Sequence, residues 1–356
     1  MWLYILVCLW PFFLKLVLSP SRYRKLYIVF AFIPYFFVSA FRGYRVGVDT
    51  AQFTGAYQSI IKADWNMLNV FRYEPMYLAI CKLLGYISSD PHILIFFSSL
   101  FMSLCAIIAT HKLSKNPWLS CFLYGTTLVF FTNMNLMRQG MACSFILLGL
   151  PYLLSGKKIS YVFFAVGAFL LHYSSAFFAI ICLIGYEKKK YNLKHLIIVA
   201  IVGLMILLVL PRLGVVKYGS YIQNVSYLKF QANFLIMILP LVFLYFRIRK
   251  TSFKHRYFVA FIFFMELILN FFSTFNASLW RISWYFHSTL YLFVPMLGEN
   301  WSERNKRALL LTTISFFSIY ALLMSKIMLH EWGLLPYEFF WNESLKLETS
   351  WRENLL

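Results

Sequence analysis

The chain has 356 residues, of which 61% are hydrophobic and only 13% are charged, and its mean hydropathy is +0.70. Soluble domains carry about 25% charged residues, so the composition argues against a soluble protein. Apolar runs of roughly 17–25 residues recur along the chain without the alternation of a transmembrane β-barrel. We therefore predict an all-α, polytopic integral membrane protein with a single transmembrane domain over residues 1–356.

The sequence carries no nucleotide, dinucleotide or zinc motif, because Walker, Rossmann and zinc-ligand spacings are missing. Its six cysteines are scattered within or beside apolar runs and are expected to be small buried hydrophobic residues. The net charge of +20 would suit nucleic acid, but the cations lie in short loops between apolar runs. We expect no metal, no other cofactor and no nucleic-acid partner.

The apolar runs predict about 10 full transmembrane helices. In chain order they cover roughly residues 1–19, 26–41, 91–110, 118–133, 137–154, 193–211, 230–246, 257–275, 282–298 and 308–328. Two further regions are ambiguous. Residues 75–88 are too short to span a membrane and contain Lys82, and residues 159–186 fit one tilted helix or two short ones.

Clusters of cations set the topology, because basic loops stay on the cytoplasmic side of a membrane. All clusters share that side only if residues 75–88 form an outer interfacial or re-entrant segment and residues 159–186 form two short helices that turn at 170–175. Both termini are then outside. The outer segments are the loops at about 42–90 and 212–229 and the C-terminal tail at about 329–356. The clusters are Arg22/Arg24/Lys25, Lys112/Lys115, Lys157/Lys158, Lys188/Lys189/Lys190/Lys194, Arg247/Arg249/Lys250/Lys254/Arg256 and Arg304/Lys306/Arg307.

Several arginines fall on the outer side, where the charge rule does not explain them. Lipid headgroups or nearby acids are an adequate explanation for any one of them. Several together at the outer membrane face favour an anionic ligand, since guanidinium groups bind phosphate through paired hydrogen bonds. These residues are Arg42, Arg45, Arg138, Arg212 and Arg281.

The stretch FRGYRVGVDTAQFTGAY, residues 41–57, places cations and a carboxylate directly after an apolar run. Asp49 is followed three positions later by glutamine, which predicts a helix with Asp49 as its N-cap. If that helix runs to about residue 63, Asp49, Phe53 and Tyr57 lie on one face. A carboxylate beside aromatic rings suits a sugar, and the loop glycines would let backbone N–H groups approach an anion. The alternative is that Asp49 is only a helix cap.

A second carboxylate and a histidine complete the candidate pocket. Glu74 precedes Pro75, which predicts a helix start, so Glu74 is either a pocket residue or an acid that pairs with Arg72 or the helix end. His172, in FLLHYSSAFF, lies at the proposed outer turn and is either a functional base or a hydrogen-bonded structural residue. Irregular backbone at membrane depth is tolerated only where it lines a cavity or is packed in protein.

Arg138 and Arg281 each lie at the outer start of a predicted span. A positive side chain is unfavourable at a helix N-terminus, so Arg138 needs a partner. A phosphate shared with the backbone N–H groups would be one, and an Arg–Glu pair is the alternative. The aromatic neighbours of Arg281, among them Tyr285, are expected at any membrane interface, so the arginine carries the information.

Several motifs occur in order: RG…VGVDTAQFTGAY, YEPMYLAICKLLGYI, MRQGMACSFILLGLPYLLSGKK, FLLHYSSAFF, RISWYF and LLPYEFFWN. With this order and spacing, residues from about 40 to 340 resemble the EpsG family of bacterial exopolysaccharide and O-antigen repeat-unit polymerases, which are of the Wzy type. One departure is Ala51-Gln52, where the family frequently has Asn-Tyr. It leaves Asp49 matched and weakens a role for Gln52.

The resemblance implies a glycosyltransferase with a GT-C-like membrane fold that uses polyprenyl-linked sugars and neither metal nor nucleotide sugar. Such polymerases join oligosaccharide units carried on undecaprenyl diphosphate, which serve as donor and acceptor, at the outer face of the bacterial inner membrane. The family also implies a polysaccharide chain-length regulator as a partner, and membrane lipids would surround the spans.

Lipid diphosphate would then be the leaving group, and its developing charge needs preorganised cations. The candidates for this role are Arg138 and Arg281, followed by Arg42 and Arg45. The attacking sugar hydroxyl needs a base or an orienting acceptor, for which Asp49 and His172 rank ahead of Glu74. The sugar-binding candidates are Phe53, Tyr57, Arg72 and Tyr285.

Two other functions compete with that of a polymerase. A lipid-linked oligosaccharide flippase should carry ionisable residues through the membrane depth, and only Glu266 and Lys15 lie deep in the predicted spans. A membrane O-acetyltransferase that acts on surface polysaccharide needs an acyl-donor route from the cytoplasm, where the loops offer only His195 and His255. Glu266 is alternatively a neutral acid or one bonded to Asn270.

Overall fold

The computed structural model describes residues 1–187, 254–273, 277–298 and 302–342. Within these ranges the chain is helical, and extended pairing is limited to one isolated antiparallel bridge between Arg42 and Phe339. The predicted all-α class is thereby confirmed for the described part of the chain. The spans predicted at 193–211 and 230–246 and the outer loop predicted at 212–229 lie outside it.

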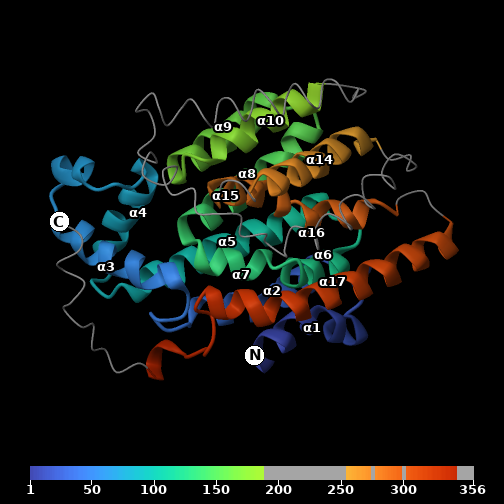
Figure 1. The fold of residues 1–356 in the computed structure, drawn as a ribbon, viewed down its shortest axis with the longest axis horizontal. Coiled ribbons are helices and arrows are strands. Elements are labelled where there is room, and N and C mark those ends of the chain that lie inside the picture. The colour runs from blue at the N-terminus through green and yellow to red at the C-terminus, as the bar shows by residue number, and fades with distance from the viewer. Residues whose placement is uncertain (188–253, 274–276, 299–301, 343–356) are drawn as a thin grey trace.

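The helices follow the apolar runs of the sequence and carry the labels of Figure 1. Those of the first half are α1 (Trp2–Val17), α2 (Arg24–Ala40), α3 (Val48–Lys62), η1 (Trp65–Val70), α4 (Pro75–Gly85), α5 (His92–Leu113), α6 (Pro117–Thr126), α7 (Val129–Asn135) and α8 (Met137–Leu154). They are followed by α9 (Lys158–Leu171), α10 (Ser175–Glu187), α14 (Arg256–Ser273), α15 (Ala277–His287), α16 (Leu290–Phe293), η2 (Val294–Met296), α17 (Glu303–Glu331) and η3 (Phe340–Asn342).

Four of the described helices are long and apolar enough to cross a membrane, namely α5, α8, α14 and the part of α17 from Glu303 to Met324. A helix of about 20 residues spans about 30 Å, the thickness of the hydrocarbon core. Large apolar side chains also point outward, with Leu16 of α1 74% exposed and Phe163 of α9 70% exposed. Apolar surface of this kind is typical of contact with lipid. The chain is a helical membrane protein, and the count of about 10 spans stays a prediction.

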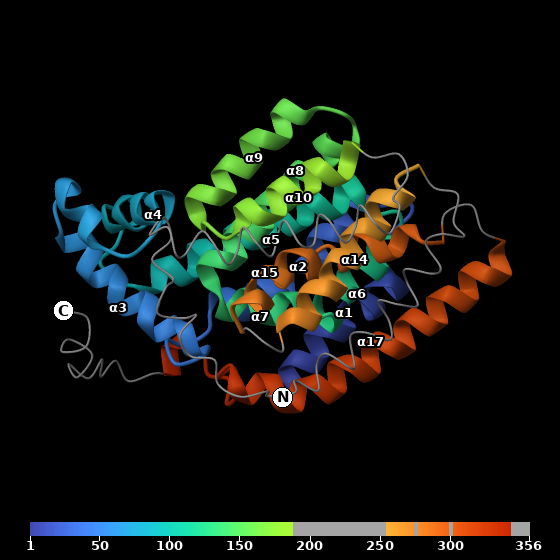
Figure 2. The same ribbon diagram turned by 45° about the horizontal axis from the view of Figure 1, so that its top comes forward.

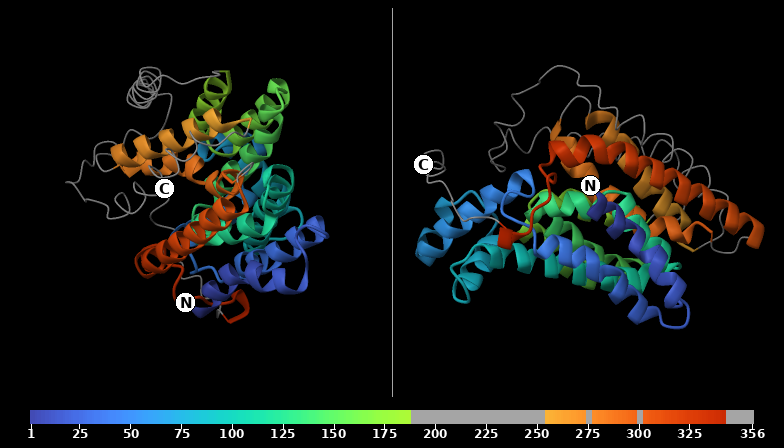
Figure 3. Two further views of the ribbon diagram at one scale, coloured as in Figure 1. Left: turned by 90° about the vertical axis from the view of Figure 1, so that its right-hand side faces the viewer. Right: turned by 90° about the horizontal axis from the view of Figure 1, so that it is seen from below.

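The bundle is elongated, and α3 and α4 lie together at one of its ends. In Figure 1, α1 and α17 lie along one side, α9 and α10 along the other, and α5, α7 and α8 between them. Figure 2 and the right-hand view of Figure 3 both place α3 and α4 at the same end. There α4 contacts α9, and α3 contacts α7. This end therefore brings together segments that are far apart in the sequence.

The ambiguous region at 159–186 forms two short helices, as predicted. The first, α9, ends at Leu171, and α10 begins at Ser175, so His172 lies in the turn between them. The backbone N–H of Ser175 donates to the carbonyl oxygen of His172 at 3.0 Å, which closes this turn. The sequence signal for the break is the Tyr-Ser-Ser run, because such residues favour turns and helix starts.

Within residues 75–88, Pro75–Gly85 form α4, whose 11 residues are too few to span a membrane. Its Lys82, which is unusual in an apolar helix, caps the end of α3. The ammonium group donates to the carbonyl oxygens of Ile61 and Ala63 at 2.9 and 2.6 Å. These carbonyls lie in the last turn of α3, where a cation is favourable. The outer location of this segment stays a prediction.

The predicted span at 118–133 is interrupted between α6 and α7. Leu128 lies at the interruption with a φ of 65°, a conformation that ends a helix. The hydroxyls of Thr126 and Thr127 donate to carbonyl oxygens one turn earlier, at 3.1 and 2.6 Å. Such bonds compete with the backbone ladder and bend helices. Hydropathy alone does not predict the interruption, because it does not take the hydrogen bonds of these two threonines into account.

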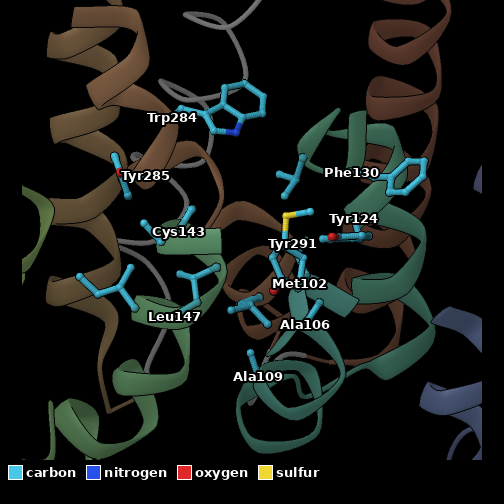
Figure 4. Packing of buried hydrophobic residues seen from close by; sticks show 14 of the residues in the cluster. Met102, Ala106, Ala109, Tyr124, Phe130, Cys143, Leu147, Trp284, Tyr285 and Tyr291 are labelled. Carbon is cyan, nitrogen blue, oxygen red and sulfur yellow. The ribbon is translucent and has the colours of Figure 1, made fainter. Parts of the chain in front are cut away.

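The predicted span at 282–298 is likewise interrupted, between α15 and α16. Ser288 and Thr289 donate their hydroxyl hydrogens to carbonyl oxygens three or four residues earlier, at 2.8 and 2.7 Å. After the interruption, Tyr291 of α16 packs edge to face on Tyr124 of α6, with ring centroids 5.2 Å apart (Figure 4). The two interrupted helices therefore meet in one core.

The segment at residues 332–340, which we call the C-terminal strap, runs beside the loop that precedes α3. The backbone N–H groups of Gly47 and Val48 donate to the carbonyl oxygens of Gly333 and Trp332 at 2.8 and 2.9 Å. Two further backbone bonds extend this pairing toward the end of α2. A helix cannot pair its own first N–H groups, so the strap supplies acceptors that the start of α3 needs.

Candidate active site

The centre of the candidate site is the Glu74 carboxylate, at the end of the bundle that carries α3 and α4. Glu74 is the N-cap residue of α4 and is buried. Its Oε1 accepts a hydrogen bond from Nδ1 of His172 at 2.6 Å, and its Oε2 accepts one from the guanidinium of Arg138. One carboxylate thus joins α4, the first turn of α8 and the turn between α9 and α10.

The protonation of this pair follows from its surroundings. Burial acts to raise the pKa of Glu74, but the hydrogen bond and charge of His172 and the charge of Arg138 lower it below its ordinary value. Burial lowers the pKa of His172 below its ordinary 6.5, although Glu74 opposes this shift. At neutral pH an ionised Glu74 therefore faces a neutral His172. The imidazole proton lies on Nδ1, and Nε2 carries the lone pair.

Arg138 is held from two sides. Beyond its bond to Glu74, its guanidinium lies over the rings of Tyr73, Phe53 and Tyr77, with centroid distances of 4.7, 5.2 and 5.6 Å. Cation–π contacts of this kind fix the plane and position of a guanidinium. The side chain remains 18% exposed, so it is oriented but still reachable. The Arg–Glu pair that the sequence left open is present, and it is Arg138 rather than Arg72 that pairs with Glu74.

Asp49 lies in the first turn of α3, and the prediction that it is the N-cap is wrong. The N-cap is Gly47, whose φ of 102° suits glycine. The capping prediction failed because the strap supplies backbone acceptors there. Asp49 is half-buried, and burial raises the pKa of its carboxyl, while the charges of Arg281 and Arg138 oppose that rise. The predicted helix end near residue 63 agrees with α3, which ends at Lys62.

Arg281 lies in α15 and contributes to the same site, although α15 is far from α3 and α4 in the sequence. It is half-buried, and its backbone carbonyl accepts a hydrogen bond from the side-chain amide of Gln139 in α8. Its charge acts on both Asp49 and His172, as does the charge of Arg138. The structure therefore brings together Asp49, Glu74, Arg138, His172 and Arg281, which come from five separate segments.

This arrangement combines two functions in one place. Two arginines could hold an anion, and a neutral imidazole backed by a carboxylate could accept a proton. Asp49 adds an acceptor for hydroxyl groups beside the arginines. Among the described residues, no group of three or more His, Cys, Asp or Glu side chains is placed to hold a metal ion.

The other two predicted diphosphate ligands lie elsewhere. Arg42 is fully buried and donates to the carbonyl oxygens of Ser39 and Met134 at 2.6 and 2.9 Å, at the ends of α2 and α7. Burial lowers its pKa to about 10. These contacts favour a structural role for Arg42. Arg45 is exposed on the loop before α3, and its binding role stays a prediction.

The predicted sugar-binding residues are mostly packed inside the protein. Phe53 is buried beneath Arg138, and Tyr57 is fully buried with its hydroxyl donating to the carbonyl of Ser88 at 2.7 Å. Tyr285 is also fully buried, with its hydroxyl 3.1 Å from that of Ser174. Arg72 is exposed. Direct sugar contact by these four residues stays a prediction. For the three aromatic rings, burial does not support such contact.

Sequence reasoning missed several supporting residues. Tyr73 and Tyr77 cover the guanidinium of Arg138, and Asn135 accepts a hydrogen bond from the backbone N–H of Asp49 at 3.4 Å. The signal was available, because the tyrosines flank Glu74 at helical spacing and Asn135 and Gln139 flank Arg138 in the sequence. Their partners, however, lie more than 60 positions away and are set by the fold.

Comparison with known proteins gives one match. A protein-family model described as the EpsG family matches residues 25–339, which include every residue of the gathered site. The chain belongs to the EpsG family. This confirms the resemblance drawn from the ordered motifs. Neither the curated proteins nor the solved structures gave a match. EpsG membership is consistent with a role in polysaccharide synthesis at a membrane.

Proposed function

We propose that this EpsG-family protein polymerises oligosaccharide repeat units carried on undecaprenyl diphosphate into O-antigen or exopolysaccharide chains. The observation that carries the proposal is that cationic side chains and a proton acceptor lie in the same site. Two arginines, Arg138 and Arg281, act on the same place as a neutral His172 that Glu74 holds by Nδ1. A glycosyl transfer from a lipid diphosphate needs both a cationic leaving-group site and a proton acceptor.

The reaction can be written on these residues. A hydroxyl oxygen of the acceptor unit attacks the anomeric carbon of the donor chain, and a new glycosidic C–O bond forms. The bond between that carbon and the donor's diphosphate oxygen breaks, and the diphosphate leaves with its electron pair. Arg138 and Arg281 stabilise the charge that develops on it. The hydroxyl proton passes to Nε2 of His172, whose imidazolium Glu74 then stabilises.

Asp49 completes the site in this proposal. It lies within the field of both arginines at the start of α3. Its carboxylate accepts hydrogen bonds from hydroxyl groups of the acceptor sugar and orients the attacking oxygen toward His172. It is also the second candidate for the base, because its pKa is raised by burial. The family provides the GT-C-like class and a chain-length regulator as partner, and both remain part of the proposal.

The proposed site faces the periplasm from the bacterial inner membrane. The basic loops support this orientation, because cations are retained on the cytoplasmic side. A periplasmic reporter enzyme fused after Asp64, which lies between α3 and η1, should be active. A silent reporter there, together with an active one after Lys157 between α8 and α9, would reverse the orientation.

Deletion of the gene followed by gel analysis of surface polysaccharide tests the proposed activity. We expect single repeat units on the lipid core and no long ladder. Complete loss of surface sugar would identify a flippase instead, because units would then fail to reach the outer face. An intact ladder with altered acetylation would identify an O-acetyltransferase.

A further inference from the structure

A second carboxylate–imidazole pair is buried in the bundle, outside the candidate active site. Glu266 lies in the middle of α14, and His287 is the last residue of α15. Oε1 of Glu266 and Nδ1 of His287 are 2.6 Å apart, and Nε2 of His287 is 2.7 Å from the carbonyl oxygen of Thr127. The side-chain amide of Asn270 donates to the backbone carbonyl of Glu266 at 3.1 Å, and the contact of the Glu266 carboxylate is the histidine.

The number of protons in this pair follows from hydrogen-bond chemistry. A carbonyl oxygen only accepts, so Nε2 of His287 must carry a proton for Thr127. The contact between Nδ1 and Oε1 needs one more proton, since two lone pairs would otherwise face each other at 2.6 Å. Whichever of Glu266 and His287 holds that proton, the pair has no net charge. A pair without net charge is the form that an apolar interior tolerates.

The pair connects three elements at the two places where helices are interrupted. Thr127 lies between α6 and α7, and His287 ends α15 just before the interruption that leads to α16. An interruption leaves carbonyl oxygens without their helical partners, and in an apolar environment each such group is costly. His287 supplies the donor for Thr127, and Glu266 fixes the ring that does so.

The two buried pairs have the same first contact but differ at the second nitrogen. In both, Nδ1 lies 2.6 Å from a glutamate Oε1. The contact of His172 with Glu74 leaves its Nε2 for the acceptor hydroxyl of the proposed reaction, whereas Nε2 of His287 is bound to the backbone carbonyl of Thr127. His287 therefore has no nitrogen to offer a substrate, and its place in the fold indicates a mechanical role.

The element held by this pair is α15, which carries Arg281. Arg281 and His287 are six positions apart, about 9 Å along the helix axis. Gln139 bonds the carbonyl of Arg281, and Trp284 stacks on the His287 ring at 4.3 Å between centroids. Figure 4 shows Trp284 and Tyr285 on different sides of α15, so the helix is packed on more than one face. Its rotation is thus set at its middle and at its C-terminal end.

We propose that Glu266 and His287 are positioning residues that orient α15 so that Arg281 faces Asp49 and His172. This inference rests on the proposed function, because it concerns the arginine that would stabilise the leaving diphosphate. Arg281 must be oriented within a few tenths of an ångström to act on developing charge, and a short helix that is interrupted at its end needs an external anchor to hold it.

Two substitutions at Glu266 separate geometry from charge. In Glu266→Gln, the amide donates to Nδ1 of neutral His287 while Nε2 stays on Thr127, so we expect kcat within threefold of wild type. In Glu266→Ala, the imidazole loses its anchor, and we expect kcat to fall at least tenfold with KM for the donor changed less than threefold. Glu266→Leu, similar in size to glutamate, should behave like alanine and controls for the cavity. Each rate is divided by the amount of monodisperse protein in the nanodiscs, and lipid-linked repeat units are the substrate.

A double-mutant cycle with Arg281→Lys tests the link to the arginine. If the pair acts through Arg281, adding Glu266→Ala to Arg281→Lys should lower kcat less than threefold further. Equal losses in Glu266→Gln and Glu266→Ala would overturn the inference, because the proton itself would then be required. Wild-type rates in Glu266→Ala, with Arg281→Ala inactive, would also overturn it. Absence of chain extension by the wild-type protein would instead overturn the proposed function, whereas normal chain extension in Arg281→Ala would remove only the role of Arg281 on which this inference rests.

Discussion

Replacement of Glu74 by glutamine changes one charge and hardly any shape, and its consequences can be worked out atom by atom. Both oxygens of Glu74 accept, one from Arg138 and one from Nδ1 of His172. Glutamine has one oxygen and one amino group. If the oxygen stays on Arg138, the amino group faces Nδ1 and forces the proton of His172 onto Nε2. If the oxygen stays on His172, two donors face each other at Arg138.

The expected loss of kcat follows from the first of these two arrangements. With its proton on Nε2, His172 is no longer a base toward the acceptor hydroxyl. A comparable tautomer change in a Ser-His-Asp triad lowers kcat by about 10⁴, and general base catalysis contributes about 10²–10⁴. We therefore expect Glu74→Gln to lower kcat by about 10²–10⁴, with KM for the lipid-linked donor within about threefold.

The assay is chain extension by purified protein in nanodiscs, with product lengths resolved on a gel and the protein checked for monodispersity. Glu303→Gln is the matched control, since Glu303 is 77% exposed and forms only an i,i+3 ion pair with Lys306 at 2.8 Å. This control should retain the wild-type rate. A Glu74→Gln protein with more than a third of wild-type kcat would falsify the tautomer argument, and His172 would then not be the base.

Three further predictions concern the same site. Arg138→Ala and Arg281→Ala should each abolish long chains while the protein still inserts in the membrane, whereas Arg304→Ala, at an exposed arginine of a predicted cytoplasmic loop, should leave the ladder unchanged; normal ladders in both of the first two variants would remove the leaving-group site. The rate should be constant at neutral pH and fall as pH drops below 6.5, because burial keeps the pKa of His172 below that value and only the neutral ring accepts a proton; a rate that rises on acidification contradicts this. Asp49→Asn should reduce chain extension about 10–100-fold, the effect of losing a hydrogen bond to a charged group, and a fully active variant would assign Asp49 a structural role only.

Local sequence information predicted the parts of the site that depend on local chemistry. His172 was placed in a turn because the cations on both sides of residues 159–186 had to share one side of the membrane, and α9 and α10 separate at that turn. A helix from Asp49 to about residue 63 was predicted from the capping pattern of Asp49 and Gln52, and α3 covers Val48–Lys62 although its N-cap is Gly47. Asp49, Arg138 and Arg281 were chosen because each is an unusual residue in its local setting.

The failures all involve partners that are distant in the sequence. The N-cap prediction for Asp49 failed because Gly333 and Trp332 of the strap provide acceptors that no local pattern shows. The local partner considered for Glu74 was Arg72, two residues away, but the fold pairs Glu74 with Arg138, for which an Arg–Glu pair was one alternative. Arg42 was expected at a ligand site, yet the carbonyl of Met134, 92 positions later, accepts its hydrogen bond in the core. Tertiary packing determines such pairs, and neither hydropathy nor residue spacing predicts it.

The pairing of the strap with the start of α3 has a consequence for how the protein is made. The strap residues that accept from the first turn of α3 are synthesised after α17. Asp49 therefore reaches its final position only after the last described span has been threaded into the membrane. A ribosome that stalls before residue 332 leaves an inserted but unassembled site. On the proposed function, the site would therefore be completed in a late step of biogenesis, and we expect chains that lack the strap to be inserted but inactive.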